Sequence, residues 1–419
     1  MPPQHQVPSD PVEPQESASD IDALHDSPLL FSASDLSSQM QDRRSFLKTL
    51  AVPCAACCAL AMMRSGFRLT PAWALEVDGD SQFKVEARFY EKLPGKTVRC
   101  KLCPRECVVA PGDRGYCRVR ENGKGTYYTV VHSRVVAAHI DPIEKKPFYH
   151  FLPGHDAYSV ATVGCNVNCK FCQNWEISQA KPEDLPAKYL PPKGLASLAT
   201  QNHCAAVAFT YSEPTVFNEY VTDAADAARE QGIKSIVVSN GFIQQEPIKR
   251  TCRHVDGIKI DLKSYSQDYY RNVVDGQLQP ILDTLVTIRK QGRWMELVYL
   301  VVPTLNDRDD EIRGMSRWIK AELGPDVPIH FTRFRPLYLL KNLPPTPVET
   351  LERLKAVADA EGLQYVYLGN VPGHPAENTY CPKCHHVVIE RAGFTVKQIN
   401  LLKGRCKSCQ HPIPGVWEG

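Results

Sequence analysis

Three closely spaced cysteines have the residue types to hold an iron–sulfur cluster. Cys165, Cys169 and Cys172 form C-x3-C-x2-C in the run Gly164-Cys-Asn-Val-Asn-Cys-Lys-Phe-Cys-Gln, with no fourth cysteine nearby. Such clusters normally take four cysteines, so three thiolates on a four-iron cubane leave one iron open. An open iron can bind and activate a substrate, which favours chemistry at the metal over plain electron storage. The alternative interpretation is three unrelated thiols on a loop.

Two further cysteine groups flank this triad, in a chain with sixteen cysteines. They are Cys100, Cys103, Cys107 and Cys117, and the two C-x2-C pairs Cys381, Cys384, Cys406 and Cys409. A disulfide framework belongs to short secreted chains, so both groups indicate metal ligands. We expect the second set to form a tetrahedral, zinc-ribbon-like site for zinc or iron. The first set fits zinc or a second four-iron cluster, with free structural cysteines as the alternative.

The N-terminal residues have the composition of a leader. Residues 1–41 are rich in Pro, Ser, Asp and Gln, which predicts disorder. Residues 42–74 contain Arg43-Arg44 and an apolar run from 50 to 63 that is too short to span a bilayer comfortably. This segment resembles a twin-arginine export signal, which predicts a folded, exported protein, periplasmic or membrane-associated, without a stable transmembrane span. The alternatives are an uncleaved anchor or a remnant signal, and a cytoplasmic protein.

The region 130–370 alternates short apolar runs with helical stretches. The six runs are 158–163, 205–209, 235–238, 257–260, 297–302 and 329–331. Gly232 and Gly362 are placed to end helices, and Thr346 is placed to cap a helix that has Pro347 at its first position. This pattern predicts an α/β fold with parallel strands, and in parallel barrels chemistry gathers at the carboxyl ends of the strands. The triad follows the first strand directly.

The cysteine groups and this alternating region divide the chain into three modules. We predict an N-terminal four-cysteine module over 75–129, the α/β module over 130–370 and a zinc-ribbon-like module over 371–419. The isolated Cys204 and Cys252 are expected to be buried as small hydrophobes. The net charge of +2 gives no electrostatic argument for nucleic-acid binding.

Four motifs together resemble a known family. They are Lys146-Pro-Phe-Tyr-His-Phe-Leu-Pro-Gly154, the triad with Phe171 before its third cysteine, Thr210-Tyr-Ser-Glu-Pro214, and Gly369-Asn-Val-Pro-Gly-His374. From about residue 90 onward the chain resembles the AmmeMemoRadiSam-system radical S-adenosylmethionine (SAM) proteins, relatives of the pyruvate formate-lyase activating enzyme. The resemblance implies a partial (β/α)6 barrel and a [4Fe–4S] cluster that cleaves SAM reductively. The resulting 5′-deoxyadenosyl radical would abstract hydrogen from an unidentified substrate, with a partner protein as one candidate.

The same resemblance suggests which residues contact SAM. Glu213 is the candidate for the SAM ammonium, although Tyr211 and Ser212 replace the glycines of the family's usual Gly-Gly-Glu-like turn. The alternative for Glu213 is a solvent-facing residue before Pro214. The ribose and the methionine carboxylate would be met by Ser239, Asn240, Asp261 and Lys263. A turn-capping role is the alternative for residues 239–241, and adenine or the substrate would meet His330, Arg333 or Arg335.

Reduction of the cluster requires a strong donor. Low-potential clusters sit near roughly −400 mV, well below the glutathione pool. We therefore expect a flavodoxin- or ferredoxin-type partner, unless the N-terminal cysteine module relays electrons itself. The competing function is a non-catalytic iron–sulfur and zinc electron carrier or scaffold.

Overall fold

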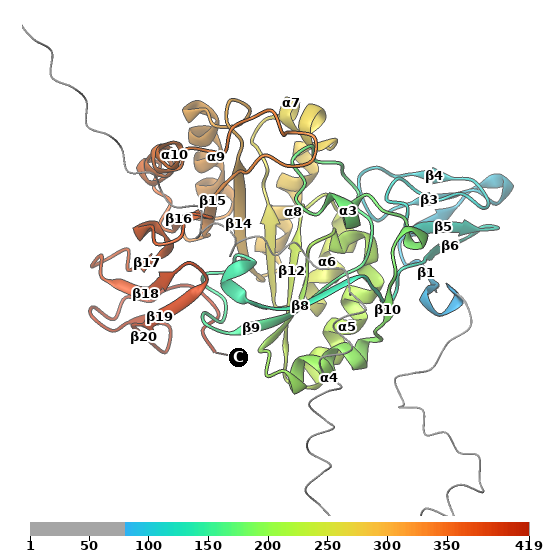
Figure 1. Ribbon diagram of the computed structural model, residues 1–419, viewed down its shortest axis with the longest axis horizontal. Coiled ribbons are helices and arrows are strands. Elements are labelled where there is room, and N and C mark those ends of the chain that lie inside the picture. Colours follow the sequence, from blue (N-terminus) through green and yellow to red (C-terminus); the bar gives the residue numbers. More distant parts are fainter. Residues whose placement is uncertain (1–79, 419) are drawn as a thin grey trace, which may run out of the picture.

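The computed structural model describes residues 80–418, and its core is one large sheet (Figure 1). The eight strands lie in the order β16-β15-β14-β13-β12-β11-β9-β8. Strands β9 to β16 of this sheet run parallel, and β8 pairs with β9 in the antiparallel sense. The predicted leader (1–41) and export signal (42–74) lie outside the described residues.

Six strand–helix units in succession build the parallel part, as the sequence predicts. The strands of the whole sheet, including the antiparallel β8, are β8 (Ala137–Pro142), β9 (Asp156–Ala161), β11 (Ala206–Phe209), β12 (Lys234–Ser239), β13 (Gly257–Asp261), β14 (Trp294–Val301), β15 (Ile329–Arg333) and β16 (Val366–Gly369). The main helices are α4 (Pro192–Gln201), α5 (Asn218–Glu230), α6 (Gln245–His254), α8 (Leu278–Lys290), α9 (Asp309–Glu322) and α10 (Val348–Ala360). Because β8 and β16 stand at opposite ends of the strand order, the sheet is a partial barrel and does not close.

Alternation along the strands separates a core face from an inner face. In β13, Ile258 and Ile260 join the main hydrophobic core, whereas Lys259 is buried on the other face. In β14, Leu297 and Tyr299 likewise join the core. Glu296 is opposite Lys259 in the register of β13 and β14, so the two residues are on the same face of the sheet. Charged residues therefore point toward the inside of the partial barrel.

The predicted helix ends are largely confirmed, with one correction. Gly232 and Gly362 follow helices with φ of +74° and +93°, values that glycine adopts without strain. Thr346, in contrast, does not cap a helix, since α10 begins at Val348 without a side-chain cap. Its hydroxyl instead donates to the Val301 carbonyl (2.6 Å) and accepts from the Phe334 backbone N–H (3.0 Å). Tertiary contacts between strand ends thus outweigh the local capping signal.

Small β-rich modules lie on either side of the barrel. The N-terminal module has sheets β1-β6-β5 and β2-β3-β4, and the C-terminal one has β17-β18-β19 and the pair β20-β21. Figure 1 shows the first at the right, beside α3, and the second at the lower left. The bounds are β1 (Val85–Glu86), β2 (Tyr90–Lys92), β3 (Val98–Cys100), β4 (Val108–Val109), β5 (Arg120–Gly123), β6 (Thr126–Thr129), β17 (Thr379–Tyr380), β18 (Val387–Ala392), β19 (Thr395–Ile399), β20 (Leu401–Leu402) and β21 (Arg405–Cys406). The remaining short elements are β7 (Arg134–Val135), β10 (Lys188–Tyr189), α3 (Trp175–Ser178) and α7 (Gln267–Tyr269).

The C-terminal module docks at the amino ends of β14 to β16. His150 Nδ1 donates to the Pro414 carbonyl (2.7 Å), and His150 Nε2 lies 2.6 Å from the Tyr367 hydroxyl. The Leu152 backbone N–H donates to the Val416 carbonyl, 2.7 Å away. The module is therefore fixed at the end of the barrel opposite to the triad. Within residues 80–418, no helix is long and apolar enough to cross a bilayer.

Candidate iron–sulfur and SAM site

The three cysteines of the triad lie on a loop after β9, at the carboxyl ends of the parallel strands. Cys169 is buried, and Cys165 and Cys172 are half-buried. Main-chain hydrogen bonds fix the loop: Lys170 N–H donates to the Val273 carbonyl (2.9 Å), and the Lys170 carbonyl accepts from Leu339 N–H (2.9 Å). The backbone conformation of the loop is therefore set by segments far away in the sequence.

The N-terminal module also holds the triad loop. Arg105 Nε donates to the Asn166 carbonyl, 2.5 Å away, inside the C-x3-C spacing. Arg118 hydrogen-bonds to Gln179, whose side-chain amide donates to the Val167 carbonyl at 3.1 Å. Two consecutive carbonyls of the loop are thus held by arginines that neighbour cysteines of the N-terminal module. Arg105 binds one carbonyl directly, and Arg118 acts on the other through Gln179. Sequence reasoning missed both arginines, and their only signal was proximity to Cys103, Cys107 and Cys117.

Polar groups close to the triad sulfurs suit a cluster with thiolate ligands. Asn240 Nδ2 lies 3.7 Å from Cys165 Sγ and donates to it. Burial raises the pKa of Cys169 to about 12, while the positive charge of Lys263 opposes that rise. Burial therefore favours neutral thiols here, so cluster ligation must displace protons. The Lys263 ammonium and the Asn240 amide would then stabilise the negative charge that remains.

Glu213 is buried at the end of β11, which rules out the solvent-facing alternative. Its Oε1 accepts from Ser239 Oγ (2.7 Å) and Thr215 N–H (2.9 Å), and its Oε2 accepts from Asn240 N–H (2.8 Å). A carboxylate has about four acceptor positions, so Oε2 can take one further donor. Burial raises the pKa of Glu213, and the hydrogen bonds from Asn240, Ser239 and Thr215 work against that rise. An ammonium group on Oε2 fits this arrangement.

The other candidate SAM contacts gather at the same edge of the sheet but are already hydrogen-bonded. The Ser239 hydroxyl also accepts from Gly241 N–H at 3.1 Å, as the turn-capping alternative expects. Asp261 forms ion pairs with Lys263 (3.2 Å) and with Lys259, a residue that the sequence did not single out. Burial raises the pKa of Asp261, but the two lysines outweigh burial and hold it at about 2. Asp261 is thus anionic and orients two ammonium groups.

Three further candidates lie on or just after β15, which ends at Arg333, so that only His330 lies away from this edge. His330 is fully buried, and its Nε2 contacts Glu296 at 2.8 Å near the amino ends of the strands. Arg333 Nε donates to the Thr346 carbonyl at 2.7 Å, and Arg335 is exposed. The expectation that His330 meets adenine or substrate is therefore wrong. Its ring belongs to the network that seats the C-terminal module, because Glu296 also accepts from the Tyr149 and His150 backbone N–H groups.

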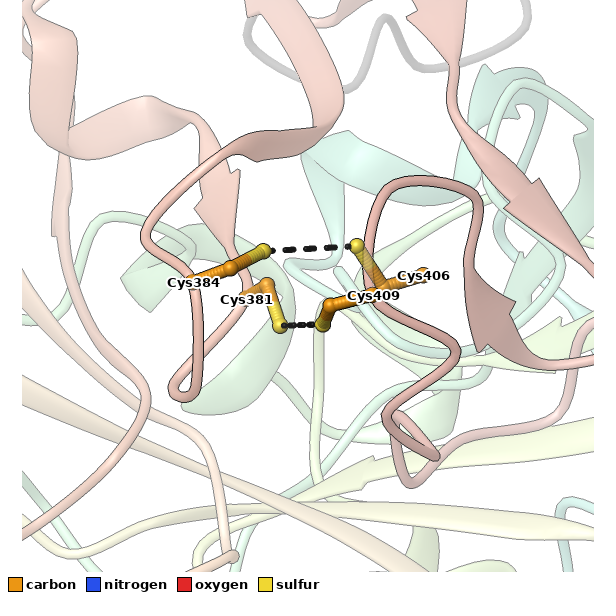
Figure 2. A group of neighbouring side chains, drawn as sticks. All are labelled: Cys381, Cys384, Cys406 and Cys409. Atoms are coloured by element: carbon orange, nitrogen blue, oxygen red, sulfur yellow. Dashed lines mark hydrogen bonds between the residues drawn. The ribbon is translucent and has the colours of Figure 1, made fainter.

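The four C-terminal cysteines form a compact site at hairpin tips (Figure 2). The ligand atoms of Cys381, Cys384, Cys406 and Cys409 all lie within 4.8 Å of one another. Their closest sulfur pairs are 3.5 and 3.7 Å apart. Four sulfurs around zinc at about 2.3 Å would be separated by about 3.8 Å along each tetrahedral edge. The spacing therefore suits one metal ion.

No other group of three or more Cys, His, Asp or Glu residues within 80–418 is so compact. Neither the triad nor the N-terminal four cysteines forms such a single-ion group. A multi-iron core at the triad does not require one, since a cubane is larger than one ion. Cys204 and Cys252 are buried, as expected of small hydrophobes.

The comparisons with known proteins agree with this site. Residues 159–315 match the family model of the radical SAM superfamily. The chain is 44% identical over 330 residues to the uncharacterized protein MJ0808 of Methanocaldococcus jannaschii, covering 78% of this chain and 98% of that protein. The chain belongs to the radical SAM superfamily, which confirms the radical SAM part of the resemblance.

Relatives with assigned roles are more distant. The pyruvate formate-lyase-activating enzyme of Clostridium pasteurianum is 25% identical over 161 residues, covering 38% of this chain and 66% of that enzyme. A crystallised domain of a pyruvate-formate lyase-activating enzyme from Bacteroides vulgatus is 17% identical, with a TM-score of 0.36, covering 40% of this chain and 99% of that one. The finer AmmeMemoRadiSam-system assignment stays a prediction.

Proposed function

We propose that this protein is an activating-type radical SAM enzyme whose substrate is a partner protein. When bound, the [4Fe–4S] cluster and SAM supply a 5′-deoxyadenosyl radical that removes a hydrogen atom from the substrate. The observation that carries the proposal is the convergence of the triad, Glu213 and Asn240 at the carboxyl ends of neighbouring strands. The similarity to activating enzymes supports a protein substrate and a low-potential donor of the flavodoxin or ferredoxin type.

Each residue at this edge has a defined task. Cys165, Cys169 and Cys172 would hold the cluster, and Glu213 would receive the SAM ammonium on the unused acceptor position of Oε2. Asn240 keeps Glu213 in place through its backbone N–H and approaches Cys165 through its side chain. Lys263, ion-paired with Asp261, offers an ammonium group for the methionine carboxylate. Ser239 acts on SAM only through Glu213, because its hydroxyl is already hydrogen-bonded on both sides.

The remaining metals and the location of the protein are part of the proposal. The C-terminal four cysteines hold zinc, and the N-terminal four hold zinc or a second cluster. The twin-arginine-like segment would export the folded, metal-loaded protein, with a cytoplasmic protein as the alternative. Cell fractionation of the natural chain and of an Arg43→Lys, Arg44→Lys variant separates these locations. If the natural chain is exported, the variant should stay in the cytoplasm; if the natural chain is cytoplasmic, the two should fractionate alike.

Product analysis tests the proposed chemistry. Anaerobically reconstituted protein is mixed with SAM and dithionite, and 5′-deoxyadenosine is measured by chromatography. We expect product from the natural chain and none from Cys169→Ala, whereas Cys252→Ala, at a buried cysteine outside the metal groups, keeps the activity. Absence of product from the fully loaded natural chain would favour the electron carrier or scaffold instead.

A further inference from the structure

Two of the N-terminal four cysteines lie near a buried positive charge that protein groups satisfy only in part. Arg120 is completely buried, and its Nη2 is ion-paired with Glu219. Its Nε donates to the Val216 carbonyl at 3.2 Å, but its Nη1 has no hydrogen-bond partner among the residues that the structure describes. Cys100 and Cys117, two of the four cysteines, are close enough to act on this guanidinium if they become thiolates. A buried, incompletely paired guanidinium is costly unless an anion lies beside it.

A metal held by four thiolates provides that anion. Both zinc and a [4Fe–4S] cluster with four cysteine ligands carry net negative charge, so Arg120 alone does not distinguish them. A second observation favours the cluster, because among residues 80–418 only the C-terminal cysteines form a group that suits one metal ion. Neither the N-terminal cysteines nor the triad, which is expected to hold a four-iron cluster, forms such a single-ion group.

The N-terminal group is also in direct contact with the triad loop. A Cβ atom on Gly164, the residue before Cys165, would lie only 2.9 Å from the Cys117 carbonyl oxygen. Arg105, between Cys103 and Cys107, donates to the Asn166 carbonyl beyond Cys165. The backbone that carries one set of ligands therefore touches the backbone that carries the other.

We propose that Cys100, Cys103, Cys107 and Cys117 hold a second [4Fe–4S] cluster that passes electrons to the triad cluster. One electron moves from a flavodoxin- or ferredoxin-type donor to this second cluster, which is reduced. The same electron then moves to the triad cluster, and the second cluster returns to its oxidised state. That electron is consumed when one carbon–sulfur bond of SAM breaks. The relay rests on the proposed function, whereas the second cluster itself does not.

Metal analysis of the full chain tests the second cluster. Two four-iron clusters would give about eight iron atoms per chain in the natural protein. We expect Cys169→Ala and Cys103→Ser each to lose about half of the iron and sulfide, and Cys252→Ser to lose none. Mössbauer spectra of Cys169→Ala should still show a four-iron cluster. An iron-free Cys169→Ala protein with two zinc ions per chain would overturn the proposal, even if Cys103→Ser fails to fold.

The choice of reductant tests the relay. The ratio of 5′-deoxyadenosine formed with reduced flavodoxin to that formed with dithionite should fall at least tenfold in Cys103→Ser, because dithionite can reduce the triad cluster directly. An unchanged ratio would overturn the relay. Failure of the natural chain to form product with either reductant, while Cys169→Ala keeps four iron atoms, would refute the proposed function and the relay but support the second cluster.

Discussion

Gly164 and Cys117 meet backbone against backbone, although they are 47 positions apart in the sequence. Gly164 has a φ of +100°, and a Cβ atom there would lie 2.7 Å from Val119 Cγ1 as well as 2.9 Å from the Cys117 carbonyl oxygen. Only glycine allows both the conformation and the approach. The start of the triad loop is thus shaped by the N-terminal module.

Replacement of this glycine should separate the two modules. We expect Gly164→Ala to lower the free energy of unfolding by roughly 1–3 kcal/mol through backbone strain, with a further cost from the clash. The variant should also bind less iron at the triad. Urea denaturation and iron analysis measure the two effects.

Gly292→Ala is the matched control for that change. Gly292 has a φ of +65°, but nothing lies within 4 Å of a Cβ placed there. It should show the strain without the clash and keep its full iron content. Equal losses of stability in the two variants would contradict the close contact.

Asn240 should adjust the reduction potential of the triad cluster. Its side-chain amide donates to Cys165 Sγ, and hydrogen bonds to ligand sulfurs stabilise the more negative, reduced cluster. A hydrogen bond worth about 1 kcal/mol corresponds to roughly 40 mV for one electron. Asn240→Ala should therefore lower the midpoint potential by about that amount in an EPR redox titration. Ser239→Ala, which removes no bond to sulfur, should leave the potential in place.

Glu213 should control SAM affinity. Glu213→Gln removes the negative charge that would face the SAM ammonium, and we expect SAM to bind at least tenfold more weakly, or about 1.4 kcal/mol. The change in the EPR spectrum of the reduced cluster on SAM addition provides the binding curve. Ser239→Ala removes only one of the three hydrogen bonds to the carboxylate and should have a smaller effect. Equal SAM affinity in Glu213→Gln and the natural chain would refute the role of Glu213.

Loss of a C-terminal ligand should spare the triad. Cys384→Ser breaks the four-sulfur site, so we expect the loss of one zinc ion per chain and faster trypsin cleavage within residues 371–418. Iron content should stay the same, because this module docks at the opposite end of the barrel. His386→Ala, at an exposed residue beside the site, should keep the zinc. A parallel loss of iron would show that the two ends depend on each other.

Acidification should weaken the docking of the C-terminal module on the barrel, because protonation of His150 is unfavourable in the folded protein. Burial lowers the pKa of His150 from 6.5 to about 4. Between these values the unfolded chain binds a proton that the folded chain does not, so stability falls as the pH drops from about 6.5 to 4. The shift corresponds to a loss of about 3 kcal/mol at most. His150→Gln should show a flatter pH dependence in urea denaturation, and an identical slope would rule out this histidine.

Local sequence patterns predicted the elements and the C-terminal four-cysteine group well, but not the contacts between modules. The apolar runs, Gly232 and Gly362 act within a few residues, and each is confirmed. Thr346 was predicted to cap a helix and His330 to meet adenine or substrate, both from local position. Their side chains instead bind residues on or just after other strands or their own, so both predictions are wrong. Arg105 and Arg120 have partners 61 and 99 positions away. Pairings at such separations depend on the complete fold, so no local pattern reveals them.

Trp417 makes the docking of the C-terminal module visible in tryptophan fluorescence. Its ring lies 5.4 Å from that of His150, and its indole N–H donates to the Ile413 carbonyl at 2.9 Å. Release of the segment would move this indole from a packed, imidazole-lined position into water. Because the chain has five tryptophans, the part of the emission that shifts on release would follow undocking in real time, without any attached dye.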